Sequence, residues 1–372
     1  MTQSHGKRIL HCIPTLMVGG AERQIVLLSA ALPAAGWETH IASVRGGPFE
    51  AQIDSAATLH RIGAAHSYDP RIAVRLYALI RRLRPSIVQT WLPMMDVTGG
   101  AAALASRVPW VIFEQASSLA YDNDWRLALR HRLGRWASGI VANSQGGLAW
   151  WHDRNDRHEF HEVIPNLVML PPAAEMAVPR QAQRPRIVYV GRLSEEKRVA
   201  TLISAMPIVR RHADIEAEIC GDGPLSSELR AQAESLGLAG AVQFPGFVMD
   251  VHSRLRASDV FVSVSAFEGQ PNTVQEAMVV GTPIVVSDIP AHREIADERC
   301  AMLVDGDDPQ AVATAILDTL ASPLRAAARA AIARERVAEP FAGAAAWTAY
   351  YERLLAGSRR RPRAGTAPNQ PA

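Results

Sequence analysis

One segment, residues 259–288, constrains the fold of this chain more than any other. It is predicted to form a strand at Asp259–Val264, a loop at Ser265–Pro271, a helix at Asn272–Gly281 and a second strand at Pro283–Ser287. The side chain of Asn272 is expected to cap the helix, with Gln275 three residues later as in a capping box. Gly281 suits the left-handed position that ends a helix. An apolar strand, a capped helix and a further strand in succession indicate an α/β fold.

The start of this helix is suited to an anion. Its first N–H groups have no partner within the helix, so they can bind a phosphate that approaches. Two carboxylates flank that position, Glu268 before the helix and Glu276 inside it. Because a carboxylate repels a phosphate, both are expected to bind neutral hydroxyl groups, as on a sugar or a ribose. The pattern fits a sugar nucleotide, and it also fits an ordinary capped helix with two surface glutamates.

The composition is that of a globular protein with room for two domains. The chain has 372 residues, is 48% hydrophobic and carries a formal net charge of +2, which argues against nucleic acid as a partner. Its cysteines, Cys12, Cys220 and Cys300, are far apart and are expected to be reduced core thiols. No apolar run reaches the length of a signal-peptide core at the N-terminus or of a membrane span elsewhere. We expect a cytoplasmic protein, either soluble or peripheral on the inner face of the membrane.

Apolar strands alternate with helices along the chain, with one interruption that is rich in Pro and Ala and predicts a linker. The expected architecture is two doubly wound, Rossmann-like α/β domains that face each other across a cleft, with a ligand site between them. We predict the first domain at 1–170, the linker at 171–185 and the second domain at 186–345. A last helix is predicted at 346–357, followed by a disordered tail at 358–372.

The first domain offers candidate ligand contacts where its strands end. Gly19 and Gly20 lie between a strand and a helix, where the backbone can approach a phosphate closely; a tight turn without a ligand fits them as well. Polar residues at the carboxyl ends of parallel strands are where α/β sheets bind ligands. The strand-end candidates are Trp91, Asp96, Glu114 and Gln115.

The first domain also leans basic. Residues 1–170 carry 17 Lys and Arg against 13 Asp and Glu. The segment Trp125–Ala137 is predicted to be an amphipathic helix. Its Trp and Leu side chains are interspersed with arginines at Arg126, Arg130, Arg132 and Arg135. Two interpretations stay open: a surface helix with solvated arginines, or contact with an anionic membrane surface.

Two further patterns resemble metal sites, and each has a simpler explanation. Asp122 and Asp124 form a D-x-D pair, but Asp124 directly precedes a helix and is expected to be its N-cap. His152, His158 and His161 lack the spacing of a helical ligand pair. We therefore expect no bound metal and no cofactor.

Arg192 and Lys197 supply two positive charges near the start of a helix in the second domain. A diphosphate leaving group needs such charges when its bond to a sugar breaks. Together with the segment around Glu268, these residues make the chain resemble the family 4 glycosyltransferases, retaining enzymes of the two-domain GT-B fold. The matching motifs are Gly191-Arg192…Glu196-Lys197, Gly221-Asp222-Gly223-Pro224, Glu268-Gly269-Gln270-Pro271-Asn272…Glu276-Ala277-Met278, Gly19-Gly20-Ala21-Glu22-Arg23, Asn143-Ser144 and Pro165-Asn166. The resemblance extends from about residue 8 to residue 355.

The resemblance implies a role for each motif. Arg192 and Lys197 would bind the donor diphosphate, Glu268 would contact the transferred sugar, and Glu276 would hold the ribose hydroxyls. The other implied donor contacts are Gly19, Gly20, Gly269, Gln270, Pro271 and Asn272, with Phe247 and Val248 at the base. The first domain would bind the acceptor, and the second would bind the nucleotide sugar. The last helix would cross back onto the first domain. The implied acceptor contacts are the strand-end residues Trp91, Asp96, Glu114 and Gln115. The implied reaction is retaining transfer of a hexose from a UDP- or GDP-linked sugar to a lipid-linked or growing glycan of a bacterial surface polysaccharide.

Two positions depart from the family pattern. Many relatives carry a histidine after the strand that here ends at Thr90, where this chain has Trp91-Leu92-Pro93-Met94-Met95-Asp96. Leu167 replaces the usual glycine after Pro165-Asn166. Two alternatives remain: a sugar-nucleotide 2-epimerase on the same fold, and a non-catalytic sugar-nucleotide-binding subunit. The Arg–Lys pair with the two glutamates argues against the first, and the missing histidine supports the second.

Overall fold

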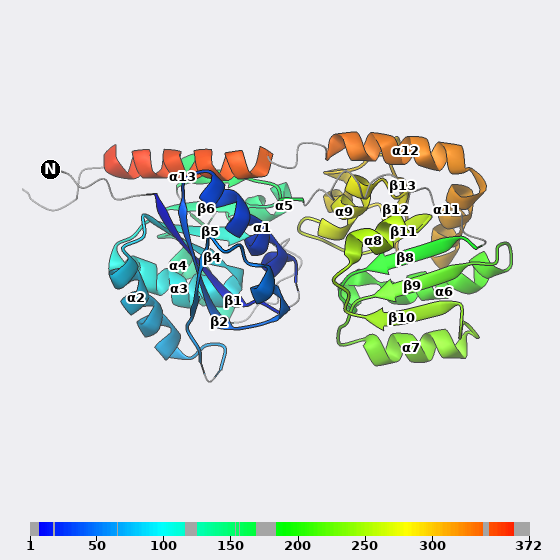
Figure 1. Ribbon diagram of the computed structural model, residues 1–372, viewed down its shortest axis with the longest axis horizontal. Coiled ribbons are helices and arrows are strands. Elements are labelled where there is room, and N and C mark those ends of the chain that lie inside the picture. The colour runs from blue at the N-terminus through cyan, green and yellow to red at the C-terminus, as the bar shows by residue number, and fades with distance from the viewer. Residues whose placement is uncertain are drawn as a thin grey trace, which may run out of the picture.

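The computed structural model contains two α/β domains that lie side by side (Figure 1). It describes residues 7–17, 19–64, 66–115, 125–152, 154–155, 157–168, 184–337 and 342–360. Most of the predicted linker, the Asp122–Asp124 pair and the tail beyond residue 360 lie outside these ranges. Within them, no helix is both long and apolar enough to cross a membrane.

The first domain is built on a seven-stranded parallel sheet with the order β3-β2-β1-β4-β5-β6-β7. Its strands are β1 (Arg8–Thr15), β2 (Glu38–Arg45), β3 (Thr58–Arg61), β4 (Ile87–Trp91), β5 (Trp110–Glu114), β6 (Gly139–Ala142) and β7 (His161–Val163). Its α-helices are α1 (Gly20–Ala34), α2 (Pro70–Leu83), α3 (Leu92–Ser106), α4 (Trp125–Gly134) and α5 (Gln145–Ala149). From the neighbouring strands β1 and β4, later strands are added toward both edges of the sheet. The loops of both halves therefore meet at the carboxyl ends of β1 and β4, where such sheets bind ligands.

The second domain repeats this plan with a six-stranded parallel sheet in the order β10-β9-β8-β11-β12-β13. The strands are β8 (Arg186–Val190), β9 (Glu216–Cys220), β10 (Val242–Gly246), β11 (Val260–Ser263), β12 (Ile284–Ser287) and β13 (Met302–Val304). The α-helices are α6 (Val199–Arg210), α7 (Ser226–Ser235), α8 (Val251–Arg256), α9 (Asn272–Val280), α10 (Pro290–Arg293), α11 (Pro309–Ala321) and α12 (Pro323–Arg336). The segment 259–288 therefore forms β11, α9 and β12, next to the switch between β8 and β11. Gly281 ends α9 in the left-handed conformation that the sequence predicted, with φ 80°.

The last helix, α13 (Ala342–Arg360), lies along the first domain rather than the second (Figure 1). Its apolar side chains Trp347, Tyr350, Tyr351 and Leu354 are buried in the core that also holds β1 and β5 of the first sheet. The helix continues to Arg360, beyond the predicted start of the tail at residue 358.

Two elements of the first domain differ from the sequence prediction. Strand β3 was not predicted, because its four residues at the edge of the sheet include two polar side chains and one charged one. Helix α2 begins at Pro70, before the first buried residue of its apolar face, Ile72. The reason is a cap: Asp69 Oδ1 accepts from the N–H of Arg71 at 2.9 Å, with Pro70 at the first helical position. The three cysteines are buried free thiols, as predicted.

The prediction of a helix with solvated arginines is wrong for Arg130. In α4 this side chain is 1% exposed and lies in the core, whereas Arg126 remains on the surface. Its guanidinium donates to Asp96 Oδ2 and to Glu114 Oε2, each at 2.7 Å. The indole of Trp151 donates to the same Glu114 oxygen at 2.9 Å. A buried cation between two buried carboxylates thus joins α3, β5 and α4.

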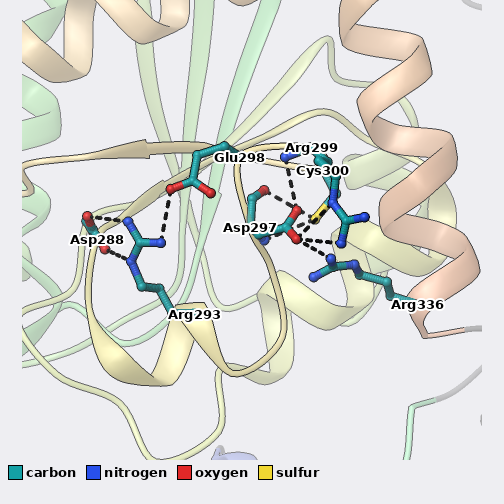
Figure 2. Close-up of polar contacts among 7 residues, drawn as sticks. All are labelled: Asp288, Arg293, Asp297, Glu298, Arg299, Cys300 and Arg336. Carbon is teal, nitrogen blue, oxygen red and sulfur yellow. Dashed lines mark hydrogen bonds and ion pairs between the residues drawn. The ribbon is translucent and has the colours of Figure 1, made fainter.

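A network of surface ion pairs holds the segment after β12 against α12 (Figure 2). The guanidinium of Arg293 bonds Asp288 and also Glu298 Oε1, the latter at 3.0 Å. Further along, Asp297 accepts from Arg299 at 2.8 Å and from Arg336 of α12. Individual exposed pairs contribute little to stability. Of those named here, the pair between Asp297 and Arg336 joins the segment to α12, and the others lie within the segment.

Candidate active site

A cleft of about 820 Å³ lies between the two domains. Its volume is in the range of small-molecule sites. Most of the residues predicted from the sequence line it, from both sides: Gly19, Gly20, Glu114, Gln115, Arg192, Lys197, Phe247, Val248, Glu268, Gly269, Gln270, Pro271, Asn272 and Glu276. Trp91 and Asp96 are not in contact with the cleft.

Helix α9 presents its N-terminus to this cleft without a side-chain cap. Pro271 occupies the N-cap position and makes no capping hydrogen bond, and Asn272 is already helical. The predicted cap by Asn272 is therefore wrong. Its side chain is engaged elsewhere, because Asn272 Oδ1 accepts from Asn166 Nδ2 of the first domain at 2.7 Å. The uncapped helix end retains the positive partial charge that suits an anion.

Lys197 and Glu268 form a pair at the edge of the anion position. The ammonium donates to both carboxylate oxygens, at 2.6 and 2.7 Å, and the Ser265 hydroxyl donates to Glu268 Oε1 at 2.6 Å. Burial by itself would raise the pKa of Glu268. The positive charge of Lys197 and these hydrogen bonds outweigh burial, so the pKa lies below its ordinary value. Glu268 is thus a carboxylate at neutral pH, held in a fixed orientation.

The other carboxylate, Glu276, is also buried but has a different partner. Arg23 of α1, in the first domain, bonds Glu276 Oε1 through Nε at 2.7 Å. Burial raises the pKa of Glu276 to about 7, against the opposing charge of Arg23. The two glutamates of the segment therefore differ: one is firmly ionised, and the other titrates near neutrality.

The first domain also touches the loop before α9. The N–H of Asn166 donates to Gln270 Oε1. A β-carbon added at Gly20 would lie 2.6 Å from Asn272 Nδ2, so a larger residue there would collide with the second domain. Leu167 can replace the usual glycine because this position bonds Gln24 through its backbone. Its N–H donates to Gln24 Oε1 at 2.7 Å, and its C=O accepts from Gln24 Nε2 at 2.8 Å. Any residue other than proline can make these two bonds.

The acceptor candidates divide into two groups. Trp91 and Asp96 are fully buried, so their assignment to an acceptor is wrong. Trp91 donates to His11 Nδ1 at 3.2 Å, and Asp96 is bonded to Arg130. Glu114 and Gln115 do line the cleft, but the Glu114 side chain is 1% exposed and accepts from Arg130 and Trp151. The structure adds Leu92, which also lines the cleft and has φ 69°, a left-handed conformation rare for a bulky residue.

Several functional candidates were missed because their importance depends on the other domain. Arg23 and Asn166 belong to motifs recognised in the sequence, but no pattern showed that they contact Glu276 and the loop before α9. Nothing in the sequence indicated the backbone of Leu92. In the described parts of the chain, no three His, Cys, Asp or Glu side chains gather as metal ligands would.

Both halves of the chain match models of glycosyltransferase families. Residues 18–170 match the model described as Glycosyltransferase Family 4, and residues 184–322 match the model described as Glycosyl transferases group 1. The boundary between the two matches falls in the predicted linker.

Curated relatives match over most of the chain. A lipopolysaccharide core biosynthesis glycosyltransferase, LpsE of Rhizobium meliloti, is 28% identical over 80% of this chain and 84% of its own. A putative glycosyltransferase of Bacillus subtilis, EpsF, is 26% identical over 77% of this chain and 80% of its own.

Solved structures show the same fold. HepE of Anabaena, in complex with UDP and glucose, superposes with a TM-score of 0.80 at 20% identity, over 96% of this chain and 100% of that one. Sucrose-phosphate synthase of Thermosynechococcus elongatus superposes with a TM-score of 0.79 at 21% identity, over 94% of this chain and 100% of that one. The chain therefore belongs to glycosyltransferase family 4 and has the two-domain GT-B fold.

Proposed function

We propose that this glycosyltransferase moves a hexose from a nucleoside diphosphate sugar to an acceptor with retention of the anomeric configuration. The observation that carries the proposal is the uncapped end of α9 in the interdomain cleft, with Arg192 and Lys197 on one side and two carboxylates beside it. The helix end and the two cations suit a diphosphate. Glu268 and Glu276 suit the hydroxyl groups on either side of it.

The donor is a UDP- or GDP-linked sugar. The HepE structures hold UDP and UDP-glucose, and a relative of Mycobacterium tuberculosis that matches over 42% of this chain is named for GDP-mannose. Phe247 and Val248 follow β10 and line the cleft, where they would flank the base.

Transfer proceeds on one face of the sugar. The bond from the anomeric carbon to the diphosphate breaks, and the bond to the acceptor oxygen forms on the same face. The acceptor proton passes to the departing diphosphate oxygen, so no protein base is needed. Arg192, Lys197 and the N-terminus of α9 stabilise the negative charge that develops on the diphosphate, and we propose that they do so without a metal or cofactor.

The acceptor is a lipid-linked or growing glycan of a bacterial surface polysaccharide, and the first domain carries a surface that fits a membrane. We call this surface the α2–α4 patch. It combines exposed apolar side chains and arginines with the half-buried ring of Tyr68. The exposed members are Val74, Tyr77, Trp125, Arg71, Arg75 and Arg126. Val74 is 67% exposed and Trp125 is 64% exposed, while Arg126 lies over the ring of Tyr68 at 5.2 Å. Exposed apolar groups beside cations suit an anionic membrane surface, here the inner face of the cytoplasmic membrane.

We expect the protein to sediment with vesicles that contain phosphatidylglycerol and not with pure phosphatidylcholine vesicles. Trp125→Ser and Val74→Ser should each reduce the bound fraction, because they remove apolar contacts without changing the charge. Leu324→Ser is a matched control, since this side chain is 89% exposed on α12 of the second domain. Equal sedimentation of all three variants would contradict a role for the patch.

A thermal-shift screen tests the donor assignment. Nucleoside diphosphates and their sugars should raise the melting temperature, with uridine or guanosine forms clearly ahead of adenosine and cytidine forms. The preferred sugar nucleotide should then release its nucleoside diphosphate slowly to water and rapidly with an acceptor. Conversion of the sugar nucleotide to an epimer, or stable binding without hydrolysis, would overturn the assignment.

A further inference from the structure

The ion pair between Arg23 and Glu276 joins the two domains inside the cleft. Arg23 lies in the first turn of α1, and Glu276 lies on α9. Their closest atoms are 2.7 Å apart, and the side chains are 20% and 7% exposed. The contact recorded is to Oε1. A carboxylate has about four lone-pair positions on its two oxygens, so the pair leaves acceptor capacity for a ligand.

Arg23 is the charged group whose field opposes the effect of burial on Glu276. Lys197 and Arg192 also line the cleft, as does the carboxyl group of Glu22, whose pKa is raised by burial. Lys197 is bonded to Glu268, and Arg192 acts electrostatically on Glu22. The helices packed against α9 also direct their cations elsewhere: Arg254 of α8 bonds Glu218 and Asp250, and Arg336 of α12 bonds Asp297. The remaining charged or titratable side chains on these two helices are His252 and Arg256 of α8 and Arg325, Arg329, Arg334 and Glu335 of α12.

We infer that Arg23 is a positioning residue for the donor: it holds Glu276 as a carboxylate, so that both vicinal hydroxyls of the ribose can donate to it. The inference rests on the proposed function, which assigns Glu276 to the ribose. A protonated carboxyl group offers fewer acceptor positions and carries a hydrogen of its own, so it pairs poorly with two hydroxyl donors. The first domain therefore contributes to donor recognition through charge, although the nucleotide lies on the second.

This role predicts a specific change in the pH dependence of donor binding. The probe is the sugar nucleotide that gives the largest thermal shift, because its diphosphate is esterified at both ends and keeps its charge through the titration. For the wild type, affinity rises with pH as Glu276 ionises near pH 7. Loss of an opposite charge within about 4–6 Å shifts a carboxyl pKa by about 1–3 units. In Arg23→Ala the rise should therefore move up by at least about one pH unit, which lowers affinity about fivefold at pH 7.

Three matched variants separate charge from structure. Arg23→Lys keeps the positive charge and should restore most of the wild-type curve. Glu276→Gln removes the titrating group, so affinity should be low at every pH, and adding Arg23→Ala should change it no further. Lys7→Ala also breaks a first-domain ion pair, with Glu352 at 2.6 Å, but at the exposed surface; its curve should match the wild type. If Arg23→Ala does not fold, Arg23→Gln removes the charge and keeps a donor group.

Calorimetric titration from about pH 5.5 to about pH 9 distinguishes the two proposals. If the wild type binds no sugar nucleotide at any pH, the proposed function fails. If the wild type binds and the Arg23→Ala curve coincides with it, the donor site stands and the role of Arg23 is overturned. A parallel loss at every pH, without a shift of the rise, also overturns it, because that pattern indicates a purely structural contribution.

Discussion

Lys197→Ala should reduce sugar transfer by about 10³-fold or more. Lys197 is the cation nearest to Glu268, and we place it on the departing diphosphate, where negative charge grows as the sugar bond breaks. Removal of the ammonium also leaves Glu268 buried without its main counter-ion, so this carboxyl group should take up a proton. Both changes act against transfer. The measurement is kcat/KM for release of nucleoside diphosphate in the presence of acceptor.

The control for this variant comes from the composition of the chain. Lysine occurs only at positions 7 and 197, so Lys7→Ala makes the same substitution at an exposed ion pair and should retain activity. Because Lys197→Ala leaves a buried carboxyl group unpaired, the double variant Lys197→Met with Glu268→Gln should melt at a higher temperature than Lys197→Ala and stay inactive. Turnover near the wild-type level in Lys197→Ala would overturn the assignment of the site.

Arg130→Met should strongly destabilise the first domain. It removes the cation that lies between Asp96 and Glu114, both of which are at most 1% exposed. Breaking a buried pair by removing one partner costs about 3–5 kcal/mol, since the remaining charge stays buried. For a domain of this size the melting temperature should fall by roughly 6–20 °C. Tryptophan fluorescence reports the transition, because all eight tryptophans lie in the first domain or on α13, which packs against it.

A compensated variant shows whether the loss comes from charge. Arg130→Met combined with Asp96→Asn and Glu114→Gln removes all three charges and should recover a large part of the melting temperature, because neutral groups are less costly to bury. Arg126→Met, on the exposed face of α4, should leave the melting temperature within about 2 °C of the wild type. A fall as large in Arg126→Met as in Arg130→Met would contradict the account of the buried network.

The general architecture was predictable because it depends on local patterns. Alternating strands and helices, the interruption near residue 171 and the glycine that ends α9 all act within a few residues of each other along the chain. The helix around Arg130 shows the limit of this reasoning. Four arginines on an amphipathic helix look alike in sequence, and only the fold shows that one of them meets two acidic side chains from neighbouring elements.

The same limit applies to the site. The donor-side residues, such as Arg192 and Glu268, sit in short motifs that a sequence displays directly, and they line one cleft. Trp91 and Asp96 lie near the end of a strand, as ligand-binding residues often do. However, Trp91 is the last residue of β4, Asp96 lies on α3, and both side chains are in the core. The pairs Arg23–Glu276 and Asn166–Asn272 link positions more than 100 residues apart, so no local pattern could reveal them.

A crystal structure of the protein with its preferred sugar nucleotide would locate the donor. We expect the diphosphate at the N-terminus of α9 within hydrogen-bonding distance of Arg192 and Lys197, the ribose hydroxyls on Glu276, and the sugar beside Glu268. A nucleotide bound outside the interdomain cleft, or bound in it with the diphosphate away from Arg192 and Lys197, would contradict this account of the site.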